Sequence, residues 1–294
     1  MTSAETTLHV ALIVGDNGRH AEVVEALREH LADSCGQPCR HPVQLATVDV
    51  ANADRYLSDS EPDLVVTIGT VAARQVAELR SAIPTLFSFI PRTVWRELKD
   101  CCVVDATTRG RVLLDQPAVR LLQLVREIRP DAQSVGVLLG PATAARQVAL
   151  ADAASNASLE LKTEHIEAGE DVGSKLRLLA TRVDALLALP DLDVYNRNTV
   201  YPILLTTYSA RIPVIGFSSP MVKAGATAGL FMSPRDVGEA IALAIQTYRS
   251  DRTLVVDDTA TPYSIEINAD VLRSLRLPPV RASEVQKNLK ESKQ

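Results

Sequence analysis

The sequence predicts an α/β protein made of two similar lobes, each with a parallel β-sheet flanked by helices. Short apolar runs rich in β-branched residues alternate with stretches whose apolar residues recur at helical spacing. The alternation stops near residues 105–111 and then starts again. Two stretches also match across the halves: residues 65–70 followed by 83–84, and residues 184–190 followed by 212–213. A length of 294 residues suits two domains.

The composition excludes several classes of protein. Hydrophobic residues make up 46 % of the chain and aromatic residues only 4 %, which favours Ala, Val, Leu and Ile cores and argues against an all-β sandwich. The net charge is −5 and no basic block is present, so we expect no nucleic-acid partner. No apolar run approaches the roughly 20 residues that cross a bilayer. The first seven residues lack the pattern of a signal peptide, so we expect either a cytoplasmic protein or a mature chain without its signal.

The first half contains five predicted strands, at residues 8–14, 43–49, 64–68, 84–90 and 102–104. The third strand is bounded by Pro62 and Gly69 and reads as buried on both faces. Thr70 then follows in a position to cap the next helix. Ligands of open α/β sheets bind at such strand ends, although most strand–helix turns bind nothing.

The polar run at residues 105–111 is the first expected crossing between lobes, and a helix over 118–128 follows it. The second half then has predicted strands at residues 135–139, 159–165, 184–189, 212–217 and 263–267. Helices are expected at 201–210, after the cap residue Ser233, and after Asn268. The polar segment 281–294 is expected to be a frayed tail.

The four cysteines do not form a metal-binding pattern. Cys35 and Cys39 flank a turn-like stretch and could close a small disulfide in an oxidising compartment, whereas Cys101 and Cys102 are expected to pack at the start of a strand. Because no second Cys/His pair follows at zinc-finger spacing, we expect no metal.

The motifs of common catalytic sites are also missing. There is no nucleophile elbow and no glycine-rich phosphate loop, and the five histidines show no convergent spacing, so each is interpreted as a surface or strand residue. We expect no catalytic residue and no cofactor. What recurs is polar residues at the carboxyl ends of strands, namely Asp16, Asn17, Thr70, Ser88, Thr143, Asp191, Asp193, Ser218 and Ser219. A ring of such residues in two lobes suits a small polar ligand.

Several segments, in their order and spacing, are similar to the ABC-transporter solute-binding proteins of the type I periplasmic-binding fold. These segments are residues 63–73, 135–141, 183–185, 212–215, 221–226, 236–238 and 263–277. The resemblance covers roughly residues 8–280 and is closest to the branch whose studied members take aromatic amino acids. It implies two Rossmann-like lobes joined by three crossings, with lobe 1 at 1–106 and 232–255 and lobe 2 at 107–231 and 256–280.

The resemblance also implies a ligand site in a cleft between the lobes, which closes about the hinge. A ligand carboxylate would meet the start of the helix at Gly69, Thr70 and Val71. The other expected contacts are Asp16 and Asn17, a hydroxyl from Ser88 and an apolar wall from Phe89 in the first lobe, and Thr143, Asp191, Asp193, Asn196 and Ser218 in the second. The implied partners are a small-molecule ligand, such as an amino acid or related carboxylate, and membrane permease subunits. The implied location is the periplasm, and we expect a monomer.

The chain departs from the family pattern at three places. Leu139-Gly140 stands where the family usually has a Tyr-Asn pair, Ser218-Ser219-Pro220 replaces an acidic position, and the loop after Leu189 is longer. The acid that pairs a ligand amino group is therefore either missing or supplied by Asp191 or Asp193. A ligand sensor that acts with a kinase or receptor is the alternative function, since it would share this fold. An enzyme would need a convergent nucleophile and base.

Overall fold

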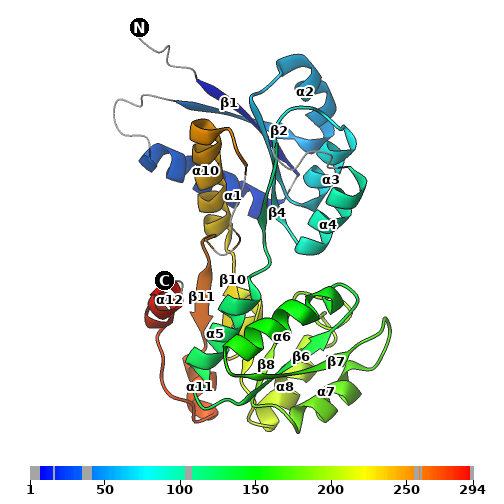
Figure 1. The fold of residues 1–294 in the computed structure, drawn as a ribbon, viewed down its shortest axis with the longest axis vertical. Helices are drawn as coiled ribbons and strands as arrows, with labels where there is room; N and C mark the ends of the chain where they lie inside the picture. The colour runs from blue at the N-terminus through cyan, green and yellow to red at the C-terminus, as the bar shows by residue number, and fades with distance from the viewer. Residues whose placement is uncertain are drawn as a thin grey trace. The chain divides into compact units, whose positions relative to one another are not determined.

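The structure is a computed structural model that describes residues 7–15, 17–34, 42–102, 108–254, 258 and 260–291. The chain divides into two compact units, each of which has its own sheet (Figure 1). Unit 1 comprises Met1–Asp115 and Met232–Tyr263, and unit 2 comprises Gln116–Phe231 and Ser264–Gln294. The chain therefore passes between the units three times. None of the helices within the described residues has the length and apolarity that a bilayer crossing needs.

Unit 1 has a five-stranded, fully parallel sheet in the order β2-β1-β3-β4-β5. Its strands are β1 (Leu8–Val14), β2 (Val43–Asp49), β3 (Leu64–Ile68), β4 (Thr85–Ile90) and β5 (Arg109–Leu113). Its helices are α1 (Gly18–Ser34), α2 (Ala53–Ser60), α3 (Thr70–Glu78), α4 (Arg92–Cys101) and α10 (Pro234–Asp251). All five residues of β3 are buried, as its β-branched run predicts for a central strand.

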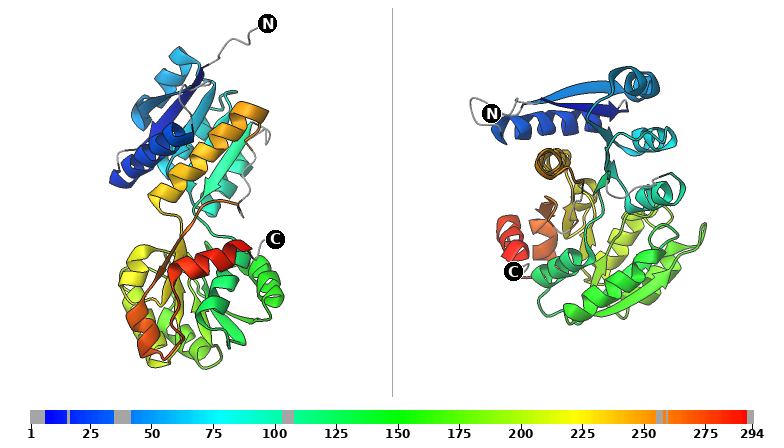
Figure 2. Two further views of the ribbon diagram at one scale, coloured as in Figure 1. Left: turned by 90° about the vertical axis from the view of Figure 1, so that its left-hand side faces the viewer. Right: turned by 45° about the horizontal axis from the view of Figure 1, so that its top comes forward.

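Helices cover both faces of the unit 1 sheet. Helices α1 and α10 pack against each other on one face, around a core that includes Leu12, Leu27 and Ile241, and Figure 2 shows the two helices next to each other. Helices α2, α3 and α4 cover the other face. Ser233 caps α10 in a capping box with Asp236, which confirms the predicted start of this helix.

Unit 2 has a six-stranded sheet in the order β11-β10-β9-β8-β6-β7, in which only β11 runs antiparallel to its neighbour. Its strands are β6 (Ser134–Leu139), β7 (Glu160–His165), β8 (Ala185–Leu187), β9 (Val214–Gly216), β10 (Ala228–Phe231) and β11 (Ser264–Ile267). Its helices are α5 (Ala118–Ile128), α6 (Gln147–Asn156), α7 (Val172–Ala180), α8 (Val200–Ser209), α9 (Ser219–Lys223), α11 (Ala269–Ser274) and α12 (Ala282–Glu291). The predicted two-lobed α/β architecture is confirmed.

Two predicted elements of the chain were wrong. The polar run at residues 105–111, predicted as the first crossing between lobes, contains the start of strand β5 (Arg109–Leu113), and unit 1 extends to Asp115 instead of ending at residue 106. Arg109 holds this edge strand in place, because its guanidinium group donates to the carbonyls of Ser81 and Ile83 and to the Thr85 hydroxyl. Cys102 follows α4, while Val103 and Val104 lie outside the described residues.

The C-terminal segment is the second correction, since residues 282–291 form helix α12 instead of a frayed tail. Val285 and Leu289 are each 1 % exposed, and the helix packs on α5 and β11. These two apolar residues are one helical turn apart, and they attach an otherwise polar helix to unit 2.

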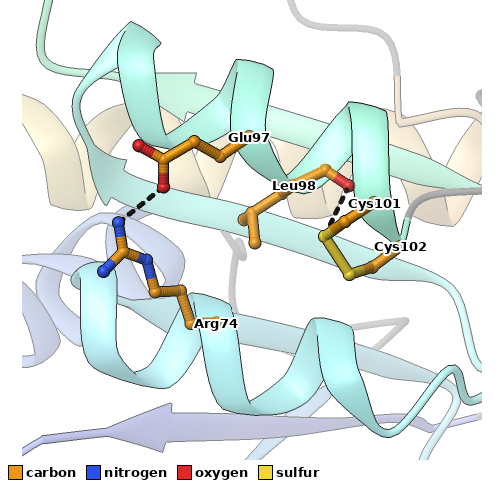
Figure 3. The surroundings of a disulfide bond; sticks show 5 residues. All are labelled: Arg74, Glu97, Leu98, Cys101 and Cys102. Carbon is orange, nitrogen blue, oxygen red and sulfur yellow. Dashed lines mark hydrogen bonds and ion pairs between the residues drawn. A yellow bond between two sulfur atoms is a disulfide. The ribbon is translucent and has the colours of Figure 1, made fainter.

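The adjacent residues Cys101 and Cys102 form a disulfide with each other at the end of α4, whereas the sequence predicted only packing at the start of a strand (Figure 3). Nearby, Arg74 on α3 donates to Glu97 on α4 at 2.6 Å and links the two helices. Cys35 and Cys39, the predicted disulfide pair, lie outside the described residues.

Candidate functional site

The unit 1 candidate site begins where the central strand β3 ends. Gly69 takes up φ 93° and ψ 165°, a conformation that is essentially restricted to glycine, and the chain turns there directly into α3. The Gly69 amide donates to the Ser88 carbonyl at 3.0 Å, which keeps the turn attached to β4. The α3 N-terminus is thereby placed at the carboxyl edge of the sheet.

Thr70 is the first residue of α3, and Gly69 is its N-cap, so the predicted capping role of Thr70 is wrong. Because glycine has no side chain, no side-chain oxygen caps this helix. The amides of Thr70, Val71 and Ala72 therefore face outward from the first turn without a cap, and the half-buried Thr70 hydroxyl lies beside them. The side chain of Val71 is 65 % exposed, so this residue offers a ligand its amide.

Ser88 and Phe89 lie near the end of β4, but the two residues face different surroundings. Ser88 is fully buried and its hydroxyl donates to the Thr67 carbonyl at 2.6 Å, so the structure removes it from the side chains available to a ligand. Phe89 has φ 57°, which is a strained value for a bulky residue, and it stands at a break in the β4–β5 register. Its ring is only partly buried. Strained residues of this kind cluster at ligand sites.

The end of β1 adds Asn17 and a residue that sequence reasoning missed, His20. The Asn17 side chain accepts from the Arg19 amide at 3.0 Å and so caps α1, and Asp16 lies outside the described residues. The half-buried His20 ring lies against Gly69 and contacts Phe89 edge-on, with 5.6 Å between ring centroids. His20 comes two residues after the polar run at residues 15–18, and this place close to the end of a predicted strand is the sequence signal that could have identified it.

In unit 2, a buried carboxylate joins the ends of β6 and β8. Asp191 is 3 % exposed and accepts hydrogen bonds from the Thr143 amide (3.1 Å), the Thr143 hydroxyl (2.9 Å) and the Asp193 amide (3.1 Å). A Cβ atom added to Gly140 would lie 2.5 Å from the carboxylate, so the glycine makes room for it. Asp191 and Thr143, two of the residues proposed from their strand-end positions, therefore lie together, but their polar atoms already satisfy one another.

A groove of about 520 Å³ opens in unit 2 between the start of α7 and the segment 192–206. Asp193 and Asn196 line it, together with Glu170, Arg177 and Thr199. Asn196 is occupied locally, because its side chain donates to the Leu192 carbonyl and accepts from the Asn198 amide. The exposed carboxylate of Asp193 has no hydrogen-bond or ion-pair partner within the described part of the chain, so it remains available.

Ser218 and Tyr195 complete the unit 2 residues near these strand ends. Ser218 is the N-cap of the short helix α9 and makes no side-chain cap bond. Tyr195 packs against Phe217 and its buried hydroxyl has no partner among the described residues. Burial, together with the negative charge of Asp191, raises the pKa of this hydroxyl above its ordinary value of 10.0, so it stays protonated at neutral pH.

Residues 42–248 match the family model of the ABC transporter substrate binding protein, a match that spans more than half of the chain and both units. The chain belongs to this family. ABC transporter substrate binding proteins are not enzymes, which agrees with the missing catalytic motifs, and a small-molecule ligand and the transporter's membrane components are the partners that the family implies.

Solved structures share the fold of this substrate-binding protein at low sequence identity. The ligand-free, open structure of a substrate binding protein with adhesive properties from Clostridium difficile has 17 % identity and a TM-score of 0.69, and the match covers 93 % of this chain and 96 % of that one. An ABC domain from Streptococcus pneumonia in complex with L-Trp has 18 % identity and a TM-score of 0.58, over 96 % and 98 % of the two chains. A periplasmic ribose ABC transporter protein from Conexibacter woesei has 13 % identity and a TM-score of 0.55, again over 96 % and 98 %. Comparison of the substrate-binding protein with curated proteins finds no match.

Proposed function

We propose that this substrate-binding protein captures an amino acid or a closely related small carboxylate for an ABC importer, outside the cytoplasm. The observation that carries the proposal is the uncapped start of α3, where the Thr70, Val71 and Ala72 amides and the Thr70 hydroxyl are available to an anion. The helix dipole adds to this preference for negative charge.

The second half of the proposed site is the acid that receives the ligand's amino group. Of the two candidates in the sequence, Asp191 is buried and accepts three internal hydrogen bonds, while Asp193 lines the unit 2 groove with an unpartnered carboxylate. We therefore assign the amino group to Asp193. This assignment supplies the acidic partner that the segment 218–220 lacks.

An aromatic amino acid is the ligand that we favour. Phe89 offers a partly buried ring beside the α3 N-terminus, and ring–ring contacts of this type contribute about 0.5–1.5 kcal/mol beyond simple burial. The L-Trp complex of the structurally similar Streptococcus pneumonia protein supports this choice. A sensor protein with the same site is the second candidate function, and co-purification with a permease or with a receptor distinguishes the two.

Substitution of Thr70 by proline tests the anion site. Proline suits the first helical position, so Thr70→Pro keeps α3 but deletes one amide and one hydroxyl. A thermal-shift screen of L-amino acids and small carboxylates first identifies a ligand, and titration calorimetry then measures its affinity. We expect Thr70→Pro to weaken binding about 10-fold to 100-fold.

Thr247→Val is the control, because Thr247 is a half-buried helical threonine on α10, like Thr70 on α3, and its hydroxyl donates to the Leu243 carbonyl. We expect this variant to bind like the wild type. Equal affinity in Thr70→Pro and the wild type would remove the α3 N-terminus from the site.

A further inference from the structure

Three contacts fix the orientation of the His20 ring. Its Nδ1 lies 3.1 Å from the Gly15 carbonyl oxygen, its edge contacts Gly69, and its ring meets Phe89 at an interplanar angle of 87°. These contacts join the ends of β1, β3 and β4 at the carboxyl edge of the unit 1 sheet. The ring is therefore held in one orientation beside the start of α3.

The contact with Gly15 determines what the other ring nitrogen can do. A carbonyl oxygen only accepts hydrogen bonds, so Nδ1 carries the proton that it donates. In the neutral ring Nε2 is then an acceptor. Nε2 has no hydrogen-bond partner within the described residues.

Nε2 lies directly against Gly69, the N-cap residue of α3. A Cβ atom added to Gly69 would lie 2.6 Å from Nε2 and 2.7 Å from Cε1, so this side of the ring is packed over the glycine. The proposed carboxylate position, at the amides of Thr70 to Ala72, follows Gly69 immediately in the chain. A ligand bound there brings the substituent next to its carboxylate towards the imidazole.

We infer that His20 is a specificity-determining residue, whose Nε2 accepts a hydrogen bond from an N–H or O–H group on the carbon next to the ligand carboxylate. This inference rests on the proposed function. It defines the ligand class as α-amino or α-hydroxy acids and disfavours simple carboxylic acids. An α-ammonium or α-hydroxyl group can donate to Nε2, whereas the CH₂ group of a simple carboxylic acid cannot.

Substitution of His20 by Asn or by Gln, whose side chains end in an amide group, distinguishes a ligand-contact role of His20 from a purely structural one. Asn places its amide near the position of Nδ1, so His20→Asn can keep the hydrogen bond to Gly15 but does not reach the position of Nε2. Gln has the opposite property, because its side-chain oxygen reaches the position of Nε2. A ligand-contact role predicts that Gln works and Asn fails, and a structural role predicts the reverse.

The probes are L-tryptophan, indole-3-lactate and indole-3-propionate, which differ only in the α-substituent, and the measurement is titration calorimetry on the full chain. We expect the wild type to prefer L-tryptophan and indole-3-lactate over indole-3-propionate by about 10-fold to 100-fold. His20→Asn is expected to lower this preference by roughly 10-fold while its affinity for indole-3-propionate changes by less than about 3-fold. His20→Gln is expected to keep the preference within about 3-fold of the wild type.

The inference is overturned if His20→Asn keeps the wild-type preference, or if it weakens all three probes equally. Melting temperatures of both variants report whether they fold. If the Asn variant does not fold, the Gln variant alone still tests the inference, because a folded His20→Gln protein that has lost the preference over indole-3-propionate also contradicts it. A wild-type protein that binds neither these probes nor any other amino acid shows instead that the proposed function has failed, and the role of His20 fails with it.

Discussion

Gly69→Ala is expected to lower the free energy of unfolding by about 3 kcal/mol and to abolish measurable ligand binding. Two effects combine in this variant. A side chain at φ 93° and ψ 165° is strained, and the new Cβ atom would lie 2.6 Å from His20 Nε2. The strain moves the start of α3, and the displaced imidazole moves into the place proposed for the ligand. Chemical denaturation and calorimetry measure the two consequences.

Substitutions at two other glycines distinguish backbone strain from the contact with His20 as the cause of the lost stability. Gly169 has φ 82° but no atom within 4 Å of an added Cβ, so Gly169→Ala reports the backbone strain alone. Gly18 has neither a positive φ nor a close neighbour, so Gly18→Ala is expected to be neutral or slightly stabilising, by about 0.5 kcal/mol. If Gly69→Ala costs no more than Gly169→Ala, the His20 ring does not pack on Gly69 as described.

The second large effect is expected from Asp191→Asn, which should lower the free energy of unfolding by about 2–4 kcal/mol. The substitution keeps the side-chain volume but replaces one acceptor oxygen by an NH₂ group. This group then faces either the two donors of Thr143, at Oδ2, or the Asp193 amide, at Oδ1, and the residue is only 3 % exposed. Buried donors that lose their acceptor are costly. Urea denaturation followed by circular dichroism measures the loss.

Asp193→Asn is the matched substitution two residues later, and the opposite result is expected. Its exposed carboxylate has no partner within the described chain, so unfolding should change by less than about 0.5 kcal/mol. The affinity for an amino acid should instead fall by about 10-fold or more, since the proposed ion pair with the ammonium is lost. An Asp193→Asn protein that binds as tightly as the wild type, or that unfolds as easily as Asp191→Asn, would contradict the division of roles between the two acids.

Local patterns were sufficient to predict central elements of unit 1. The run at residues 64–68 is β-branched and apolar, and it is bounded by Pro62 and Gly69, so the strand and its turn could be predicted without tertiary information. The same holds for α10, where Ser233 and Asp236 form the cap. These signals lie within a few residues of the element that they specify.

Peripheral elements depended on contacts from distant parts of the chain. Strand β5 begins Arg109-Gly110-Arg111, a polar sequence that is typical of a loop, and it becomes a strand because Arg109 bonds to the segment 81–85. Helix α12 has few apolar residues and is stable because Val285 and Leu289 find a surface on unit 2. Neither partner surface can be read from the local sequence.

The candidate site shows the same limit. The expectation that ligands bind at the carboxyl ends of strands selected residues by their place in the chain. It could not distinguish Ser88 and Asp191, whose side chains already form internal hydrogen bonds, from Asp193, whose carboxylate is available to a ligand. His20 was missed because its neighbours are Gly69 and Phe89, which are 49 and 69 residues away in the sequence. Side-chain hydrogen bonding, rather than position along a strand, assigns these roles.

The central claim is that the ligand carboxylate binds at the start of α3, and amide chemical shifts test it most directly. We predict that a saturating amino acid ligand strongly shifts the NMR signals of the Thr70, Val71 and Ala72 amides, which follow the end of β3. The amide of Asp59, near the end of α2 and before the start of β3, should stay unchanged. Saturable binding that leaves the three α3 amides unshifted would show that the carboxylate lies elsewhere.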